Sequence, residues 1–119
     1  MTETRRKIDS LVGEQLSAVS FVMDYVEFHF NGPVFRALSH PVLFDRNLEI
    51  GFPSPGSRDA LCGLIGQTVS KVVVLKGEAI TLQFERGASL RVPLDKASRI
   101  GPEAAHFMGT LVHAPLDVW

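Results

Sequence analysis

The sequence predicts an α+β fold that is predominantly β, in which two repeated units share one core. The main observation is an internal repeat: residues 11–19 (LVGEQLSAV) return as residues 64–72 (LIGQTVSKV), with four identical positions. The matches continue downstream, where Phe30 corresponds to Phe84, Gly32 to Gly87 and Arg36 to Arg91. Units of about forty residues are too small to bury a core alone. We therefore expect the units, about residues 8–38 and 58–93, to be related by approximate two-fold pseudosymmetry.

Each unit is predicted to begin with a helical turn that ends at a glycine. In the second unit Ser57 is suited to the N-cap, and Gly66 holds a position where helices often end in a left-handed residue. Gly13 holds the matching position in the first unit. Both glycines are therefore expected to have positive φ. The apolar stripes ahead of them are Ile8, Leu11 and Val12 in the first unit and Leu61, Leu64 and Ile65 in the second.

Three strands, joined as a β-meander, are predicted to follow each helical turn. The run 71–75 (KVVVL) has apolar residues on both faces, which favours a central strand covered on two sides. The second strand of each unit alternates between apolar and polar residues, a period typical of one buried face and one solvated face. The predicted strands are 15–23, 25–30 and 35–37 in the first unit and 68–76, 80–85 and 90–92 in the second.

The rest of the chain is expected to complete a single domain over residues 1–119. Residues 39–56 contain three prolines, which predicts a surface crossing between the units, with a short edge strand at 47–52. The tail, residues 101–119, is predicted to begin with a helical turn, because a proline stands near its start, and to end with a pair of strands. Trp119 is expected to pack against the core.

Composition and motif content exclude several classes of function. The formal net charge of −1 gives no reason to expect nucleic acid or an anionic membrane surface as a partner. The apolar runs are shorter than the roughly 20 residues of a membrane span, and the polar start of the chain predicts no signal peptide. No spacing of histidine and cysteine suits a metal, and no phosphate-binding glycine loop occurs, so neither a metal nor a cofactor is expected.

The cysteine content points to a reducing compartment. Cys62 is the only cysteine, so no intramolecular disulfide is possible. Small secreted domains usually rely on several such bridges, and we therefore expect a cytoplasmic protein. Cys62 lies between Leu61 and Leu64 in an apolar stretch, which predicts a buried and unreactive thiol.

One group of side chains is a candidate for binding or chemistry. Glu27 and His29 should project from the polar face of one strand, and the neighbouring strand of the hairpin carries Arg36. A carboxylate, an imidazole and a guanidinium on one face would suit the binding of an anion or the transfer of a proton. The alternative is a solvated sheet face with cross-strand charge pairs. Glu103 and His106, three residues apart on the predicted helical turn, could meet as a surface pair.

The repeated motif also carries a resemblance. A Leu-(Ile/Val)-Gly-x-x-(Val/Leu)-x-x-Val strand opener and a Phe-x-x-Gly hairpin cover residues 11–19, 30–32 and 64–92. In these segments the chain resembles small uncharacterised bacterial proteins with a duplicated β-meander unit. The motif describes a capped turn and a strand, and the resemblance implies no activity, cofactor or catalytic residue.

The sequence as a whole predicts a non-enzymatic interaction or ligand-binding module that acts through surface contacts. An accessory or immunity-type protein that neutralises a partner is one form of this function. A small enzyme or anion-binding protein that uses Glu27, His29 and Arg36 is the alternative. A homodimer is expected because apolar strands such as 71–75 and 15–23 exceed what two helical turns can cover. Closure of the strands into a barrel is the competing arrangement.

Overall fold

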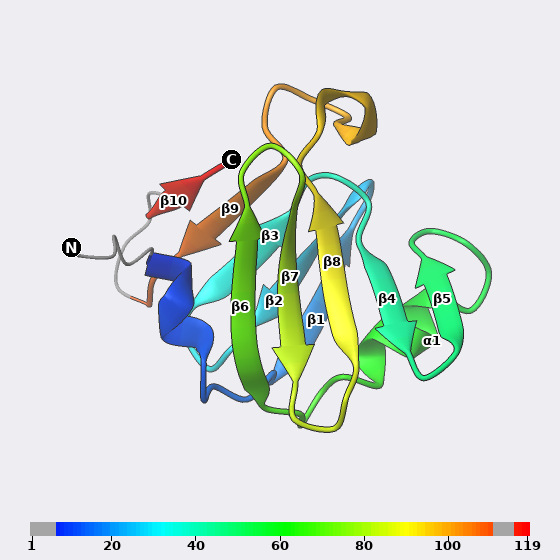
Figure 1. Ribbon diagram of the computed structural model, residues 1–119, viewed down its shortest axis with the longest axis vertical. Helices are drawn as coiled ribbons and strands as arrows, with labels where there is room; N and C mark the ends of the chain where they lie inside the picture. The colour runs from blue at the N-terminus through cyan, green and yellow to red at the C-terminus, as the bar shows by residue number, and fades with distance from the viewer. Residues whose placement is uncertain (1–6, 111–115) are drawn as a thin grey trace.

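The fold is predominantly β and consists of two antiparallel five-stranded sheets that pack face to face (Figure 1). The computed structural model describes residues 7–110 and 116–119. Buried apolar side chains from both sheets form one core cluster. Within the described residues, no helix is long and apolar enough to cross a membrane.

The first sheet combines the N-terminal meander with two strands from the C-terminal part of the chain. Its order is β1-β2-β3-β9-β10. Along β2, Val26 and Phe28 are buried in the core, because alternate side chains of a strand point to opposite faces. Glu27 and His29 therefore lie on the outward face. The strands are β1 (Ala18–Val22), β2 (Tyr25–His29), β3 (Val34–Ala37), β9 (Ala105–Met108) and β10 (Asp117–Val118).

The second sheet combines the second meander with the hairpin that links the two meanders. Read from one edge, its order is β6-β7-β8-β4-β5. Ile80 and Leu82 of β7 and Leu90 of β8 are fully buried. The chain crosses from the first sheet to the second after β3 and returns after β8. The strands are β6 (Val69–Leu75), β7 (Ala79–Phe84), β8 (Ser89–Pro93), β4 (Val42–Asp45) and β5 (Leu48–Gly51).

A short helical element lies at each open side between the sheets (Figure 1). The 3-10 helix η1 (Lys7–Leu11) contacts β6, and the backbone N–H of Ile8 donates a hydrogen bond of 2.9 Å to Asp117 Oδ2 on β10. The helix α1 (Ser57–Cys62) contacts β1 and β5. Ile8 and Leu61 are buried. The two elements therefore cover the sides of the core that a pair of sheets leaves open.

The two sheets are joined at one corner, where the segments that precede β1 and β6 pair with each other. Gln15 and Thr68 form an isolated antiparallel bridge. The backbone hydrogen bonds on either side of this bridge are reciprocal. They run from Gly13 N to Val69 O (2.8 Å), Gly66 N to Leu16 O (2.8 Å), Leu16 N to Gln67 O (3.0 Å) and Val69 N to Glu14 O (2.9 Å).

The glycines at this corner have the predicted backbone conformation. The φ angle is 89° at Gly13 and 91° at Gly66, which confirms the expectation of positive φ at both. An added Cβ would meet no atom within 4 Å at either position. The requirement for glycine therefore comes from the left-handed backbone and not from close packing.

Strand β6 does not have its predicted environment. The apolar run 71–75 predicts a central strand, but β6 is an edge strand of the second sheet. Val72 and Val74 pack against the core, while Val73 lies on the opposite face. Lys71 and Leu75 are exposed. The prediction fails because valine-rich composition indicates a good fit to a pleated surface and does not distinguish an edge strand from a central one.

The second helical element is shorter than predicted. α1 ends at Cys62 and not at Gly66, and its N-cap is Gly56, so that Ser57 is the first helical residue. The Cys62 thiol is exposed, which corrects the expectation of a buried side chain. A six-residue helix turns Cys62 away from the face that Leu61 buries, because successive residues differ in direction by about 100°.

The C-terminal segment also differs from its prediction. The helical turn expected at the start of residues 101–119 is absent from its described part, where β9 begins at Ala105. A 3-10 turn, η2 (Lys96–Ser98), comes earlier instead. Strand β10 and the packing of Trp119 against the core agree with the expectations for the tail. Residues 111–115, which include part of the predicted strand pair, lie outside the described residues.

Candidate functional site

The candidate residues meet on the outward face of the first sheet, as the alternation along β2 predicts. Glu27 on β2 stands directly opposite Arg36 on β3. The Arg36 Nε–H donates a hydrogen bond of 2.8 Å to Glu27 Oε2. The guanidinium carbon of Arg36 also lies 5.5 Å from the ring centroid of Tyr25, within cation–π range. The side chains of Arg36 and Glu27 are 26% and 17% exposed, so the pair is partly shielded from solvent.

His29 joins this pair with a single ring nitrogen. Its Nε2 lies 3.6 Å from Glu27 Oε1 and 3.1 Å from Ser20 Oγ. A serine–histidine–carboxylate relay needs the serine and the carboxylate on different ring nitrogens, so that one nitrogen takes the proton while the other is held. Here both groups face the same nitrogen. The three residues therefore lack the geometry of a catalytic triad.

Two further residues extend the site on the other side of Arg36. His106 Nδ1 lies 3.5 Å from Arg36 Nη1, and His106 Nε2 lies 2.9 Å from Glu103 Oε1. An arginine N–H can only donate, and a carboxylate can only accept. Both contacts are satisfied when the imidazole is neutral and carries its proton on Nε2, because Nδ1 then accepts and Nε2 donates.

His106 was not predictable from the sequence as a member of the site. Glu103 and His106 do meet, but His106 lies on strand β9 and not on a helical turn. Pairing of β3 with β9 brings His106 opposite Arg36 across 70 positions of sequence. No local pattern signals a contact at that separation. Ser20 has a weak signal, because it lies on the strand that precedes β2.

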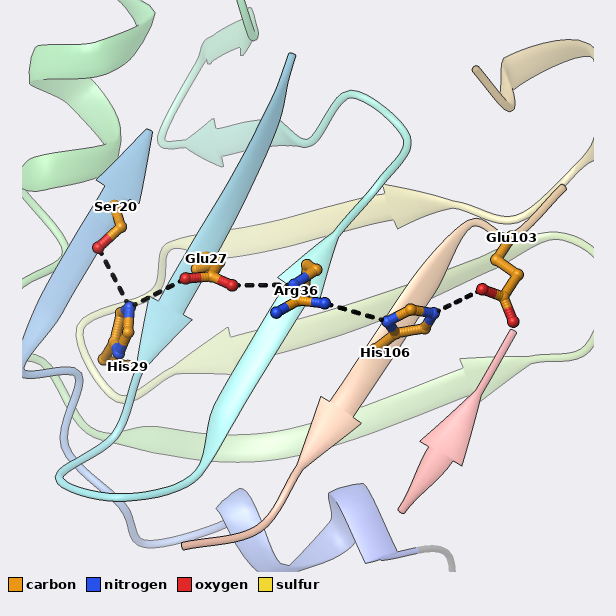
Figure 2. Close-up of polar contacts among 6 residues, drawn as sticks. All are labelled: Ser20, Glu27, His29, Arg36, Glu103 and His106. Carbon is orange, nitrogen blue, oxygen red and sulfur yellow. Dashed lines mark hydrogen bonds and ion pairs between the residues drawn. The ribbon is translucent and has the colours of Figure 1, made fainter. Parts of the chain in front are cut away.

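The site is a row of side chains in register across four strands, and Figure 2 shows it as a continuous chain of polar contacts. We use the name polar row for Ser20, Glu27, Arg36 and His106, which are direct cross-strand neighbours in that order. His29 links Ser20 to Glu27, and Glu103 extends the chain of contacts beyond His106. With neutral imidazoles, two carboxylates and one guanidinium leave the group with one excess negative charge.

Two cavities in the described part of the structure are not lined by the residues of the polar row. One, of about 210 Å³, is lined by Asp24, Tyr25, Leu38, Ile100, Gly101, Pro102 and Glu103. Another, of about 690 Å³, is lined by Lys7, Asp9, Ser10, Val12, Pro33, Phe107, Gly109 and Leu116. Neither is lined by Glu27, His29 or Arg36. Among the described residues, no group of three potential ligands could hold a metal ion.

Comparison with known proteins adds no assignment to this geometry. No protein-family model, curated protein or solved structure matches the chain. The chemistry of the site therefore has to be inferred from its own residues.

Proposed function

We propose that the protein is a non-enzymatic interaction module that recognises a protein partner through the outward face of the first sheet. The observation that carries this proposal is the polar row, whose donors and acceptors are held in place by contacts along the row on an open sheet face. Preformed side-chain positions lower the entropy that binding must offset. An accessory or immunity-type protein that neutralises its partner is one form of this function.

The alternative, a small enzyme or anion-binding protein that uses Glu27, His29 and Arg36, has less support. His29 presents one nitrogen to both Ser20 and Glu27, which does not suit a proton relay. The guanidinium of Arg36 is already bound by a carboxylate at 2.8 Å. An anion would have to compete with Glu27 for the guanidinium, in a site that carries one excess negative charge when its two imidazoles are neutral.

We further propose that the two meanders are copies of one unit, related by approximate two-fold pseudosymmetry. The strand order β1-β2-β3-β9-β10 has its counterpart in β6-β7-β8-β4-β5. Exchange of Gly13 with Gly66, of Glu14 with Gln67 and of Leu16 with Val69 converts each hydrogen bond at the corner into its partner. A pseudo-two-fold axis between Gln15 and Thr68 accounts for this reciprocity.

A homodimer in the cytoplasm is the assembly that we propose. The outward face of the second sheet presents Val73 and Phe44, both partly exposed, and Leu75, which is 51% exposed. Apolar side chains on one face favour a two-fold pairing of identical surfaces. An exposed lone thiol, Cys62, is suited to a reducing compartment.

A comparative capture experiment tests the recognition proposal. The tagged wild-type chain, Arg36→Ala and the matched control Arg91→Ala are each used to capture proteins from a lysate of the native organism. We expect a protein that binds the wild type and Arg91→Ala but binds Arg36→Ala at least about tenfold more weakly, as for a central arginine of an interface. Equal capture by all three would contradict the proposal.

Thermal denaturation with inorganic phosphate distinguishes the recognition proposal from the anion-binding alternative. On our proposal, 10 mM phosphate shifts the Tm of wild type and Arg36→Ala equally. A stabilisation of the wild type that Arg36→Ala abolishes would favour the anion-binding alternative, because specific binding to the folded state raises Tm.

A further inference from the structure

The cavity of about 210 Å³ lies at one end of the first sheet, next to the polar row. It is formed by the start of β2, the residue after β3 and the loop 100–103. Tyr25 lines it and also contacts Arg36, while Glu103 lines it and also binds His106. The cavity is therefore directly connected to the surface that we propose as the recognition face.

The lining combines negative charge with apolar surface. Asp24 and Glu103 contribute two carboxylates, and the described lining includes no lysine, arginine or histidine. Asp24 has no hydrogen bond or ion pair among the described residues, and Glu103 uses only Oε1 for His106. Leu38, Ile100 and Pro102 supply the apolar part.

This combination selects against several kinds of occupant. A divalent metal would need about six oxygen ligands, and the described residues contain no group of three potential ligand side chains. A drug-sized ligand needs a cavity of about 300 to 1,000 Å³. A lysine or arginine side chain, by contrast, has an apolar stem that packs on apolar surface and a cationic head that pairs with carboxylates.

Apolar residues beside the cavity would contact the partner residues that flank the bound lysine or arginine. Ile100 is 52% exposed, and Met23, which precedes Asp24 in the β1–β2 turn, is 94% exposed. Exposed apolar residues beside a charged cavity provide contact surface that partly shields an ion pair from water.

We propose that this cavity binds a lysine or arginine side chain of the protein partner. The inference rests on the proposed function, which makes the partner a protein. It adds that a basic side chain of this partner binds in the cavity. The aliphatic stem packs between Ile100, Leu38 and Pro102, and the cationic head lies between the carboxylates of Asp24 and Glu103.

The test uses short peptides and NMR, because Tyr25 is the only tyrosine of the chain and lines the cavity, so that its ring signals can be assigned without ambiguity. The probes are acetyl-Gly-Lys-Gly-amide and its norleucine analogue, which keeps most of the stem and lacks the charge, at constant ionic strength. We expect saturable shifts of the Tyr25 ring and Ile100 signals with the lysine peptide, with a Kd of about 1 to 10 mM. Binding of the norleucine peptide should be at least about fivefold weaker.

Variants assign the effect to the two carboxylates. Asp24→Asn should weaken binding of the lysine peptide by about two- to fivefold, the range of a single partly exposed ion pair. Glu103→Gln, which keeps an oxygen acceptor for His106, should act similarly. Asp45→Asn is the matched control, because Asp45 is an exposed carboxylate in the β4–β5 hairpin. Equal binding of both peptides, absence of shifts at Tyr25, or no effect of either cavity variant would overturn the proposal.

Failure of this inference can be told apart from failure of the proposed function. If Arg36→Ala loses partner capture but the peptides cause no shifts, the lysine or arginine site in the cavity is refuted, and the recognition role of the first sheet's face is kept. If the peptides cause shifts but Arg36→Ala captures the partner as well as the wild type does, the cation site in the cavity is kept and the recognition role of the sheet face is refuted.

Discussion

The outward face of each sheet carries a cross-strand row of side chains, which is polar throughout in the first sheet and partly apolar in the second. On the first sheet the polar row is Ser20, Glu27, Arg36 and His106. On the second sheet, the cross-strand neighbours in the same order are Val73, Thr81, Arg91 and Val42. Only the arginine is common to both rows.

The two arginines show what the neighbours contribute. Arg36 is held by Glu27, Tyr25 and His106, and its side chain is only 26% exposed. Arg91 is exposed and makes no side-chain hydrogen bond or ion pair with the residues that the structure describes. The same residue type on the third strand of each meander is therefore fixed in one sheet and free in the other. The fixed donors and acceptors of the polar row suit specific recognition of a partner. The valines around the free Arg91 suit apolar packing, which depends less on direction.

The largest expected effect concerns assembly. If the second sheet's face forms the dimer, the wild type should have about twice the mass of a 13.1 kDa chain in light scattering at low micromolar concentration, and Val73→Lys should have the mass of one chain. Ser20→Lys, at the matching place on the first sheet, should remain dimeric. A monomeric wild type would end the proposed role of this face.

The next effect concerns the corner where the segments before β1 and β6 pair with each other. Gly13→Ala and Gly66→Ala should each lower the free energy of unfolding by about 1 to 2 kcal/mol, because alanine is disfavoured at positive φ. Urea denaturation measures both. If the units are equivalent, the two costs should agree within about 0.5 kcal/mol, since equivalent positions have equal backbone environments. A cost at only one glycine would argue against the pseudosymmetry.

The smallest effect concerns the arginines themselves. Arg36→Ala should cost about 1 kcal/mol of unfolding free energy, because it leaves the partly buried Glu27 without its main partner. Arg91→Ala should cost less than about 0.5 kcal/mol, as for an exposed surface residue. A double-mutant cycle with Glu27→Gln should give a coupling of about 0.5 to 1 kcal/mol for Arg36 and none for Arg91. Equal costs for the two arginines would contradict the distinction between a fixed and a free side chain.

The sequence by itself determined the meander strands and the two left-handed glycines. Both are local properties: alternation along β2 and β7 sets which side chains are buried, and a glycine with φ near 90° is set by its own turn. The proximity of Glu27, His29 and Arg36 was predictable for the same reason, because a hairpin joins their strands.

Only the tertiary structure decided which strand lies beside which across the crossovers. Pairing of β3 with β9 added His106 to the site, and the edge position of β6 left its valines half covered. Such pairings depend on the relative free energies of burying whole strands, which a local hydrophobic period does not report. The candidate residues Glu27, His29 and Arg36 were therefore predictable from the sequence. The continuous polar row and the cavity next to it form only when distant segments pack together.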